Sequence, residues 1–330
     1  MLSAISLARH SIFWESYIIE DDVEPDFNFF ETLTEKARSG VKVKIVLDGF
    51  GSFGLSGATR KKLTDSGVEI CAFNSWFRRI HRKILIVDGR VAFMGGVNIG
   101  QKYKKWLDLQ VRLTGKSIVG ALTKSFARSY FYCGGADKSL LSIMKKSPLR
   151  TTELWLLEHF PFAGRLLLPR YYKEKIAQAK EKIVIVTPYF IPHNWLIRAL
   201  SIASGRGVSV EIIMPAKTDL SFINFANHLF ADITSKSGLK FFLTKDMIHA
   251  KVLLVDDKVG LVGSNNIDAL SFDWNAEASV SFEEEEMIAD LRTITELWKR
   301  DSIPLEHSHI KKPFYYKFLA FIVRLIQPIL

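Results

Sequence analysis

Cysteine is scarce in this sequence, and long uncharged hydrophobic runs are missing from it. Its two cysteines, Cys71 and Cys133, are too few for a disulfide framework, and no cysteine–histidine pair has a zinc-binding spacing. We therefore expect a reducing compartment, with both thiols inert in the core. No run of 18 apolar residues lacks a charge, and the N-terminus has no signal-peptide pattern, so neither a membrane-spanning helix nor secretion is expected.

Acidic residues are also fewer than basic ones. The 35 Asp and Glu residues against 45 Lys and Arg residues give a net charge of +10, which favours an anionic partner. Nucleic acid, anionic lipid and phosphorylated small molecules all have the right sign. A hydrophobic share of 48% excludes a disordered chain, and 330 residues are enough for two domains.

An 18-residue segment occurs twice. Residues 81–98 read HRKILIVDGRVAFMGGVN, and residues 249–266 read HAKVLLVDDKVGLVGSNN. The offset is the same at both ends, since 249 − 81 = 168 and 266 − 98 = 168. Five chemically distinctive pairs match in this register: His81 and His249, Lys83 and Lys251, Asp88 and Asp256, Gly95 and Gly263, and Asn98 and Asn266. The chain is therefore interpreted as a duplication whose halves meet near residues 145–165.

Each half alternates helical and strand patterns, which predicts an α/β fold with covered sheet faces. We expect two similar α-β-α sandwich domains, related by a pseudo-two-fold axis and with the active site at their interface. The predicted boundaries are 1–148 for the first domain, 149–312 for the second and 313–330 for an apolar tail. Helices are expected at 26–39, 56–66 and 195–204, and strands at 83–87 and 91–94 around a turn at Asp88.

The repeated residue types suit phosphodiester chemistry. Residues i and i+2 of a strand share a face, so each His-x-Lys pair would present an imidazole beside an ammonium group. Lysine and asparagine side chains can bind phosphate oxygens, so neither a metal nor another cofactor is required. Two imidazoles allow covalent catalysis with acid–base assistance. The expected catalytic set is His81, Lys83, Asn98, His249, Lys251 and Asn266.

Two acids follow the motifs at matching distances and could orient the imidazoles. Asp108 lies 27 residues after His81 (108 − 81), and Glu277 lies 28 residues after His249 (277 − 249). Each acid begins an apolar stretch. We therefore predict that Asp108 holds His81 and Glu277 holds His249, each through the ring nitrogen that does not react.

The pattern His-x-Lys-(x4)-Asp-(x6)-Gly-(Gly/Ser)-x-Asn, present twice, resembles the signature of the phospholipase D superfamily. The resemblance covers nearly the whole chain and implies a phospholipase D-like fold. It also implies a phosphohistidine intermediate on His81, with His249 as the general acid, and a supporting structural role for Asp88 and Asp256. One chain would then form the site alone.

Within that superfamily the chain resembles bacterial cardiolipin synthases. The stretches that carry this resemblance are 17–21, 47–52, 95–100 with Trp106 and Asp108, 187–192 and 268–275. The implied reaction is transfer of a phosphatidyl group from phosphatidylglycerol to a lipid hydroxyl, which makes cardiolipin. Hydrolysis to phosphatidic acid, a nuclease and an anion-binding module without activity are the alternatives. The stretches shared with cardiolipin synthases and the apolar tail argue against a nuclease. Two intact motifs argue against the module without activity.

Membrane contact is expected from the tail 313–330, and residues 154–168 are a second candidate whose alternative is interdomain core. The tail 313–330 is apolar but interrupted by Lys317 and Arg324, as in an interfacial element, and packing on the second domain is its alternative. Residues 76–79, Trp-Phe-Arg-Arg, could line the mouth of the site, or form an ordinary solvated loop. The resemblance then implies peripheral association with the bacterial cytoplasmic membrane and its anionic phospholipids.

Overall fold

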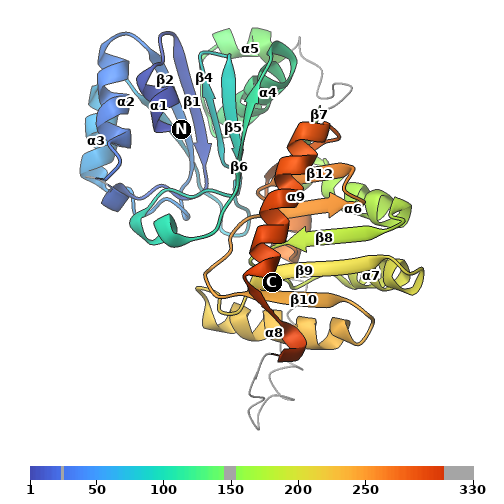
Figure 1. Cartoon of the computed structure of the whole chain (residues 1–330). Coiled ribbons are helices and arrows are strands. Elements are labelled where there is room, and N and C mark those ends of the chain that lie inside the picture. The colour runs from blue at the N-terminus through green and yellow to red at the C-terminus, as the bar shows by residue number, and fades with distance from the viewer. Residues whose placement is uncertain (24–25, 145–153, 308–330) are drawn as a thin grey trace. The chain divides into compact units, whose positions relative to one another are not determined.

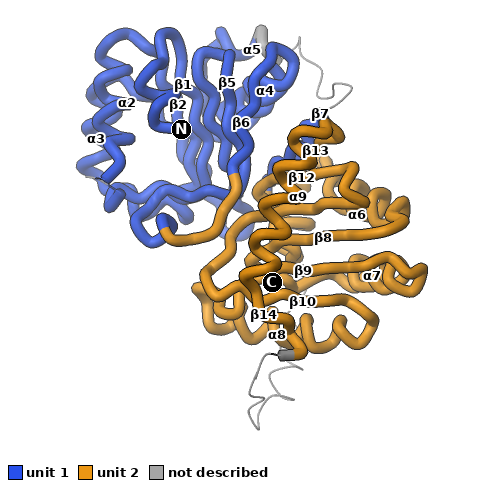
Figure 2. Tube along the Cα trace, in the orientation of Figure 1, with its two compact units in different colours: residues 1–104, 110–158, 276–280 blue, residues 105–109, 159–275, 281–330 orange. Residues whose placement is uncertain are grey.

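The computed structural model describes residues 1–23, 26–144 and 154–307 (Figure 1). The predicted domain boundary at 148 and the predicted membrane tail 313–330 lie outside these residues. The chain divides into two compact units (Figure 2): unit 1 contains residues 1–104, 110–158 and 276–280, and unit 2 contains residues 105–109, 159–275 and 281–330. Two short segments, 105–109 and 276–280, thus belong to the unit that their sequence neighbours do not.

Unit 1 is built on a six-stranded sheet in the order β3-β2-β1-β4-β5-β6. Strands β1 to β3 are parallel, whereas β4 pairs antiparallel with β1, β5 with β4 and β6 with β5. The strands are β1 (Ser11–Ser16), β2 (Lys42–Asp48), β3 (Glu69–Phe73), β4 (Ile84–Val87), β5 (Val91–Gly95) and β6 (Gln110–Thr114). The helices are α1 (Leu2–Ser6), α2 (Phe29–Arg38), α3 (Gly57–Asp65), α4 (Lys116–Tyr132) and α5 (Ser139–Met144), with short turns η1 (Asp21–Val23) and η2 (Gln101–Lys105).

The central strands of unit 1 are apolar on both faces because helices cover both faces. On one face Trp14, Ile45 and Leu85 join a core cluster to which α1, α2 and α3 contribute. On the other face Phe13 stacks on Phe126 of α4, with 5.1 Å between ring centroids. Strands buried on both sides lose the alternation of polar and apolar residues, as the four apolar, buried residues of β4 show.

The second sheet has the order β14-β10-β9-β8-β11-β12-β13-β7, and unit 2 contains its strands except for most of β7 and of β13. Its helix α9 runs across the strands in Figure 1, and α7 and α8 contact β9 and β10. The strands are β7 (Leu154–His159), β8 (Lys182–Val186), β9 (Ser209–Pro215), β10 (Lys240–Thr244), β11 (Val252–Val255), β12 (Val259–Gly263), β13 (Glu277–Phe282) and β14 (Ser302–Pro304). The helices are α6 (Leu167–Gln178), α7 (Asn194–Gly205), α8 (Ser221–Ser235) and α9 (Glu285–Arg300), with short turns η3 (Pro161–Ala163), η4 (Leu270–Trp274) and η5 (Leu305–His307).

The two strand orders confirm the duplication. The order β3-β2-β1-β4-β5-β6 recurs as β10-β9-β8-β11-β12-β13, with the same parallel and antiparallel pairs in the strands whose register is defined. The second sheet adds β14 and β7 at its edges. Both sheets are sandwiched by helices, so the predicted α/β class is confirmed. Within the described ranges we find no helix with the length and hydrophobicity that a membrane span requires.

Most elements expected from the sequence are present, with two local differences. The predicted helices correspond to α2, α3 and α7, and the hydroxyl of Ser56 caps α3 by accepting from the Thr59 amide. Cys71 is only half-buried because β3 is the edge strand of its sheet. The first motif strand begins at Ile84, so the motif residues before it precede the sheet ladder.

Candidate active site

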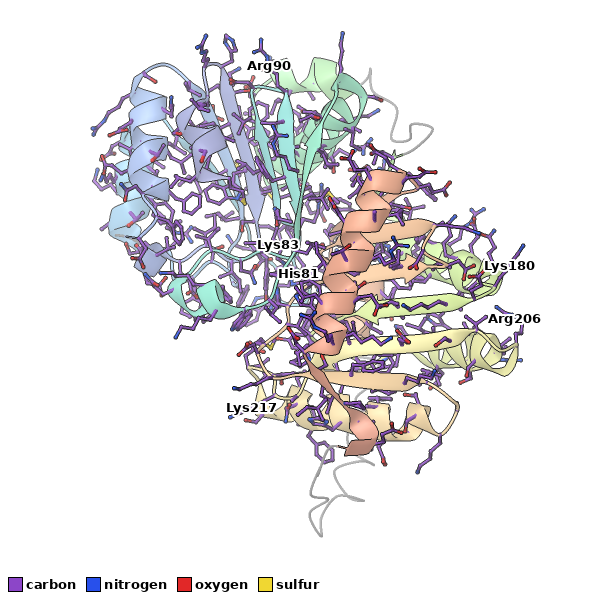
Figure 3. All side chains as sticks on the ribbon, in the orientation of Figure 1. His81, Lys83, Arg90, Lys180, Arg206 and Lys217 are labelled. Carbon is purple, nitrogen blue, oxygen red and sulfur yellow. The ribbon has the colours of Figure 1, made fainter. Side chains whose placement is uncertain are left out.

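The first motif histidine lies where the chain enters β4, at the end of the strands of unit 1 (Figure 3). Its backbone N–H donates to the carbonyl of Ala276 at 2.9 Å, and the N–H of Ile80 donates to a carboxylate oxygen of Asp48 at 2.9 Å. These contacts take the place of sheet pairing at His81, and β4 begins only at Ile84, so the predicted placement of His81 and Lys83 within a strand is wrong. Both residues are nevertheless held by the backbone next to them.

The second motif histidine is held in the equivalent way. Its segment forms an isolated parallel bridge between Leu107 and Ile248, and the His249 N–H donates to the Leu107 carbonyl at 2.6 Å. In unit 1 the corresponding bridge joins Ile80 to Ala276. Each motif is therefore paired with a segment that follows the other motif in the sequence.

Each imidazole is hydrogen-bonded to a carboxylate through Nδ1. His81 Nδ1 lies 3.0 and 3.1 Å from the two oxygens of Glu277, and His249 Nδ1 lies 2.7 Å from Oδ2 of Asp108. The predicted partners, Asp108 for His81 and Glu277 for His249, are therefore exchanged. The physical reason is the backbone pairing just described, because it places residues 105–109 beside His249 and residues 276–280 beside His81.

The carboxylates fix which ring nitrogen is engaged. Glu277 is fully buried, and Asp108 is nearly so. Burial raises the pKa of Asp108, but His249 and Lys251 outweigh this effect and hold that pKa below its ordinary value. An ionised carboxylate at Nδ1 keeps the imidazole ring in one orientation and stabilises its protonated form, as in catalytic triads. The chemistry proposed below is therefore assigned to Nε2.

The motif lysines and asparagines are buried as well. Lys83 Nζ donates to the carbonyl of His81 at 2.7 Å, and Lys251 donates in the same way to His249. Among the described buried atoms, the carboxamide oxygens of Asn98 and Asn266 have no hydrogen-bond partner. A buried polar group without a partner is costly, and amide oxygen and nitrogen are interchangeable by a flip, so both asparagines can turn an N–H towards a bound anion.

Each motif histidine also has an aromatic ring beside it, and these two contacts were not predicted from the sequence. Tyr17, just after β1, meets the His81 ring edge-on with centroids 4.6 Å apart, and Lys83 Nζ lies 5.0 Å from the centre of the Tyr17 ring. Trp106 lies 5.3 Å from the His249 ring. Burial, with a further contribution from Asp48, raises the pKa of Tyr17 to about 12, so this phenol stays neutral. Its position at the carboxyl end of a buried parallel strand was the available sequence signal.

The motif aspartates hold backbone amides rather than the imidazoles. The Asp88 carboxylate accepts from the N–H groups of Arg9, His10 and Ser11 at the start of β1. The Asp256 carboxylate accepts in the same way from the N–H groups of Lys180, Glu181 and Lys182 at the start of β8. Both aspartates have positive φ, 54° and 53°, which Asp and Asn tolerate better than other non-glycine residues.

We expect Asp88→Asn and Asp256→Asn each to lower the free energy of unfolding at pH 7 by about 1–3 kcal/mol, because charge-assisted bonds to three amides are weakened. Asparagine retains the backbone preference, so the change isolates the charge. Backbone hydrogen bonds outweigh burial and lower the pKa of both carboxyls. Their contribution is thus complete above the ordinary aspartate pKa and is lost as pH falls through the depressed value.

Urea unfolding at pH 7 and pH 3 measures this effect. The exposed Asp65, paired with Lys61 on α3, provides the control: Asp65→Asn should change stability by less than about 0.5 kcal/mol. Equal stability of Asp88→Asn and wild type at pH 7 would contradict the assigned role.

Comparison with known proteins places this site in a family. The chain matches the family model described as "Cardiolipin synthase, PLD-like domain" over residues 1–130 and 172–298, ranges that contain both motifs and both acids. The chain belongs to this family. The phospholipase D relationship indicated by the motifs, and the phosphatidyltransferase class implied by the resemblance to cardiolipin synthases, are thereby confirmed.

Individual relatives are named in agreement with this family. Cardiolipin synthase A of Pseudomonas syringae pv. syringae (strain B728a) is 32% identical over the whole chain, which spans 72% of that protein. Cardiolipin synthase of Halalkalibacterium halodurans is 29% identical over 99% of the chain and 69% of the relative. The chain spans 61% of cardiolipin synthase A of Pseudomonas entomophila, at 32% identity over 85% of the chain. The relatives are therefore longer than this chain.

A solved structure shares the fold. The phosphatidylserine synthase of Haemophilus influenzae Rd KW20 aligns with a TM-score of 0.78, covering 100% of this chain and 92% of that one, at 16% identity. At that identity the likeness supports the fold and carries no argument about the substrate.

Proposed function

We propose that this protein makes cardiolipin by transferring a phosphatidyl group from one phosphatidylglycerol to the terminal hydroxyl of another, with release of glycerol. The observation that carries this proposal is the pair of motif histidines, each held at Nδ1 by a carboxylate, in a chain of the cardiolipin synthase family. Both motifs are proposed to serve one reaction, since a phosphohistidine mechanism needs a nucleophile and a separate proton donor.

In the first step Nε2 of His81 attacks phosphorus, and the bond from phosphorus to the glycerol oxygen breaks. His249 gives its Nε2 proton to that oxygen, so glycerol leaves as a neutral alcohol. In the second step His249, now neutral, takes the proton of the acceptor lipid's hydroxyl, whose oxygen attacks phosphorus and releases His81. Lys83, Lys251, Asn98 and Asn266 are proposed to bind the phosphate oxygens and stabilise the charge that develops on them.

The proposed partner is an anionic phospholipid surface, and the proposed location is the bacterial cytoplasmic membrane, reached by peripheral association. The net charge of +10 supports this location, because basic proteins are attracted to anionic headgroups. The family supports a phospholipid as substrate.

Lipid product analysis tests the proposal. Purified protein is incubated with phosphatidylglycerol vesicles, with and without phosphatidylethanolamine, and the products are resolved by mass spectrometry beside a His249→Ala control. We expect cardiolipin and glycerol in equal amounts, both absent in the control. Phosphatidic acid without cardiolipin would make the protein a hydrolase, and absence of any lipid product would contradict the substrate assignment.

A further inference from the structure

The most exposed large hydrophobic side chains of the described residues lie in two loops of unit 1. Phe53 is 82% exposed, Trp76 80% and Phe77 79%. Single exposed apolar residues are ordinary on a protein surface, but three large aromatic side chains this exposed in neighbouring loops indicate a surface that is covered in use.

The two loops form one surface. Residues 49–55 follow β2 and residues 74–79 follow β3, so both extend from the carboxyl ends of adjacent parallel strands. Phe50 lies 5.9 Å from Trp76, and the guanidinium of Arg79 lies 4.5 Å from the centre of the Phe50 ring. We call this surface, Phe50, Phe53 and residues 76–79, the aromatic loop patch.

The patch is linked to the first motif by direct contacts within unit 1. The hydroxyl of Ser52 donates to the Tyr17 carbonyl at 2.9 Å, and the Tyr17 ring meets the His81 ring. Asp48 accepts from the N–H groups of Phe50 and Ile80, which joins the loop after β2 to the residue before His81. Whatever covers the patch is therefore brought to the same end of the sheet as His81.

The duplication supplies an internal comparison. Seven residues, 74–80, separate the end of β3 from His81, whereas four residues, 245–248, separate the end of β10 from His249. The first loop is thus three residues longer (7 − 4 = 3), and it carries Trp76 and Phe77 where the shorter loop has Lys245 and Asp246. Both motifs have the same histidine, lysine and asparagine. The longer loop with its aromatic pair therefore has a role that the shared catalytic residues do not need.

The composition of the patch selects its occupant. Neither loop, 49–55 or 74–80, contains an acidic residue, and Arg78 and Arg79 follow the aromatic pair directly. Aromatic rings with adjacent arginines suit the boundary between acyl chains and anionic headgroups, where the rings enter the apolar layer and the cations stay among the phosphates. A protein partner or a second copy of this chain would not require that the loops carry basic residues and no acidic ones.

We propose that the aromatic loop patch inserts into the surface of an anionic phospholipid bilayer and brings His81 to the level of the lipid phosphates. The choice of a phospholipid surface rests on the function proposed above. The insertion itself is a property of the loops and does not require turnover.

Vesicle co-sedimentation of the full chain tests the insertion. The double variant Trp76→Ser/Phe77→Ser is expected to bind phosphatidylglycerol vesicles more weakly by on the order of 10- to 100-fold, since two large apolar side chains no longer leave water. Wild type should bind phosphatidylcholine vesicles less tightly than phosphatidylglycerol vesicles. The matched control is Leu7→Ser, a 75% exposed position after α1 at the other end of the sheet, which should bind like wild type.

Fluorescence quenching by brominated phosphatidylglycerol locates the contact directly. Tryptophan fluorescence of the wild type should fall when it binds brominated vesicles. The Trp76→Phe variant should bind these vesicles with the same affinity but show a smaller fall, since the tryptophan in contact with the lipid is absent. Vesicle binding by the double variant equal to that of wild type, or no quenching attributable to Trp76, would overturn the proposal. So would a variant that only loses self-association in gel filtration, since the patch would then be a protein interface.

Turnover separates this inference from the proposed function. The double variant should keep the wild-type rate on dispersed short-chain phosphatidylglycerol while losing rate on vesicles in proportion to binding. Wild type that binds through Trp76 but turns over no lipid would refute the proposed reaction and leave the insertion standing.

Discussion

Replacing either motif histidine by glutamine is expected to reduce lipid turnover by on the order of 10⁴-fold or more, with each single variant as inactive as the double variant. His81→Gln removes the nucleophile and His249→Gln removes the proton donor, and neither step has a substitute. Glutamine fills a similar volume and can hydrogen-bond to the neighbouring carboxylate, so the fold should survive. Release of glycerol from phosphatidylglycerol is the measurement, with circular dichroism as the check on folding.

The two histidines can be distinguished by the leaving group. In a phosphodiester of p-nitrophenol, the p-nitrophenolate leaves without needing a proton. With such a substrate, His249→Gln should therefore still form the phosphohistidine, and His81→Gln should not. Because the bond from phosphorus to a histidine nitrogen is labile in acid, the reaction is quenched with denaturant at alkaline pH, and intact mass measurement should show the trapped adduct only when His81 is present. An adduct on His249 in the His81→Gln protein would reverse the assignment, which the resemblance supplied and the near-symmetric motifs did not.

Much of the fold could be predicted because the sequence repeats itself. One register relates 81–98 to 249–266, and the repeated strand order follows from it. The exchange of the two acids could not be predicted in this way. Asp108 and Glu277 have nearly the same spacing from the preceding motif, so a symmetric duplication is equally compatible with both pairings. Backbone bridges at Ile80 and Ile248 decide between them, and such bridges join residues distant in sequence.

Other features depended on three-dimensional context in the same manner. The sequence indicates an aromatic, basic segment at 76–79, but only the structure places it beside Phe50 and shows how far its rings are exposed. The contact of Tyr17 with His81 likewise arises where β1 ends beside the start of β4, its antiparallel neighbour. Burial and proximity at strand ends are properties of packing, and no local pattern specifies them.

The exchanged pairing predicts which acid supports which half of the reaction. Glu277→Gln and Asp108→Asn are each expected to lower kcat by on the order of 10²- to 10⁴-fold with little effect on folding, because an amide leaves the ring in the wrong tautomer. If Glu277 serves the nucleophile, Glu277→Gln should slow adduct formation even with p-nitrophenolate as leaving group. Adduct formation by Asp108→Asn should be rescued by that leaving group, since Asp108 supports the proton donor of the first step.

The pH–rate profile gives an independent readout of the same pairing. Asp108→Asn removes the negative charge that stabilises protonated His249, so the alkaline limb of the profile for phosphatidylglycerol should move to lower pH. The matched control is Asp273→Asn. Asp273 pairs with His193, which lies outside the two motifs, so this substitution should leave the pH–rate profile unchanged. If Glu277→Gln, rather than Asp108→Asn, were rescued by the better leaving group, the roles of the two histidines would be the reverse of those assigned, because the hydrogen bonds fix only which acid acts on which ring.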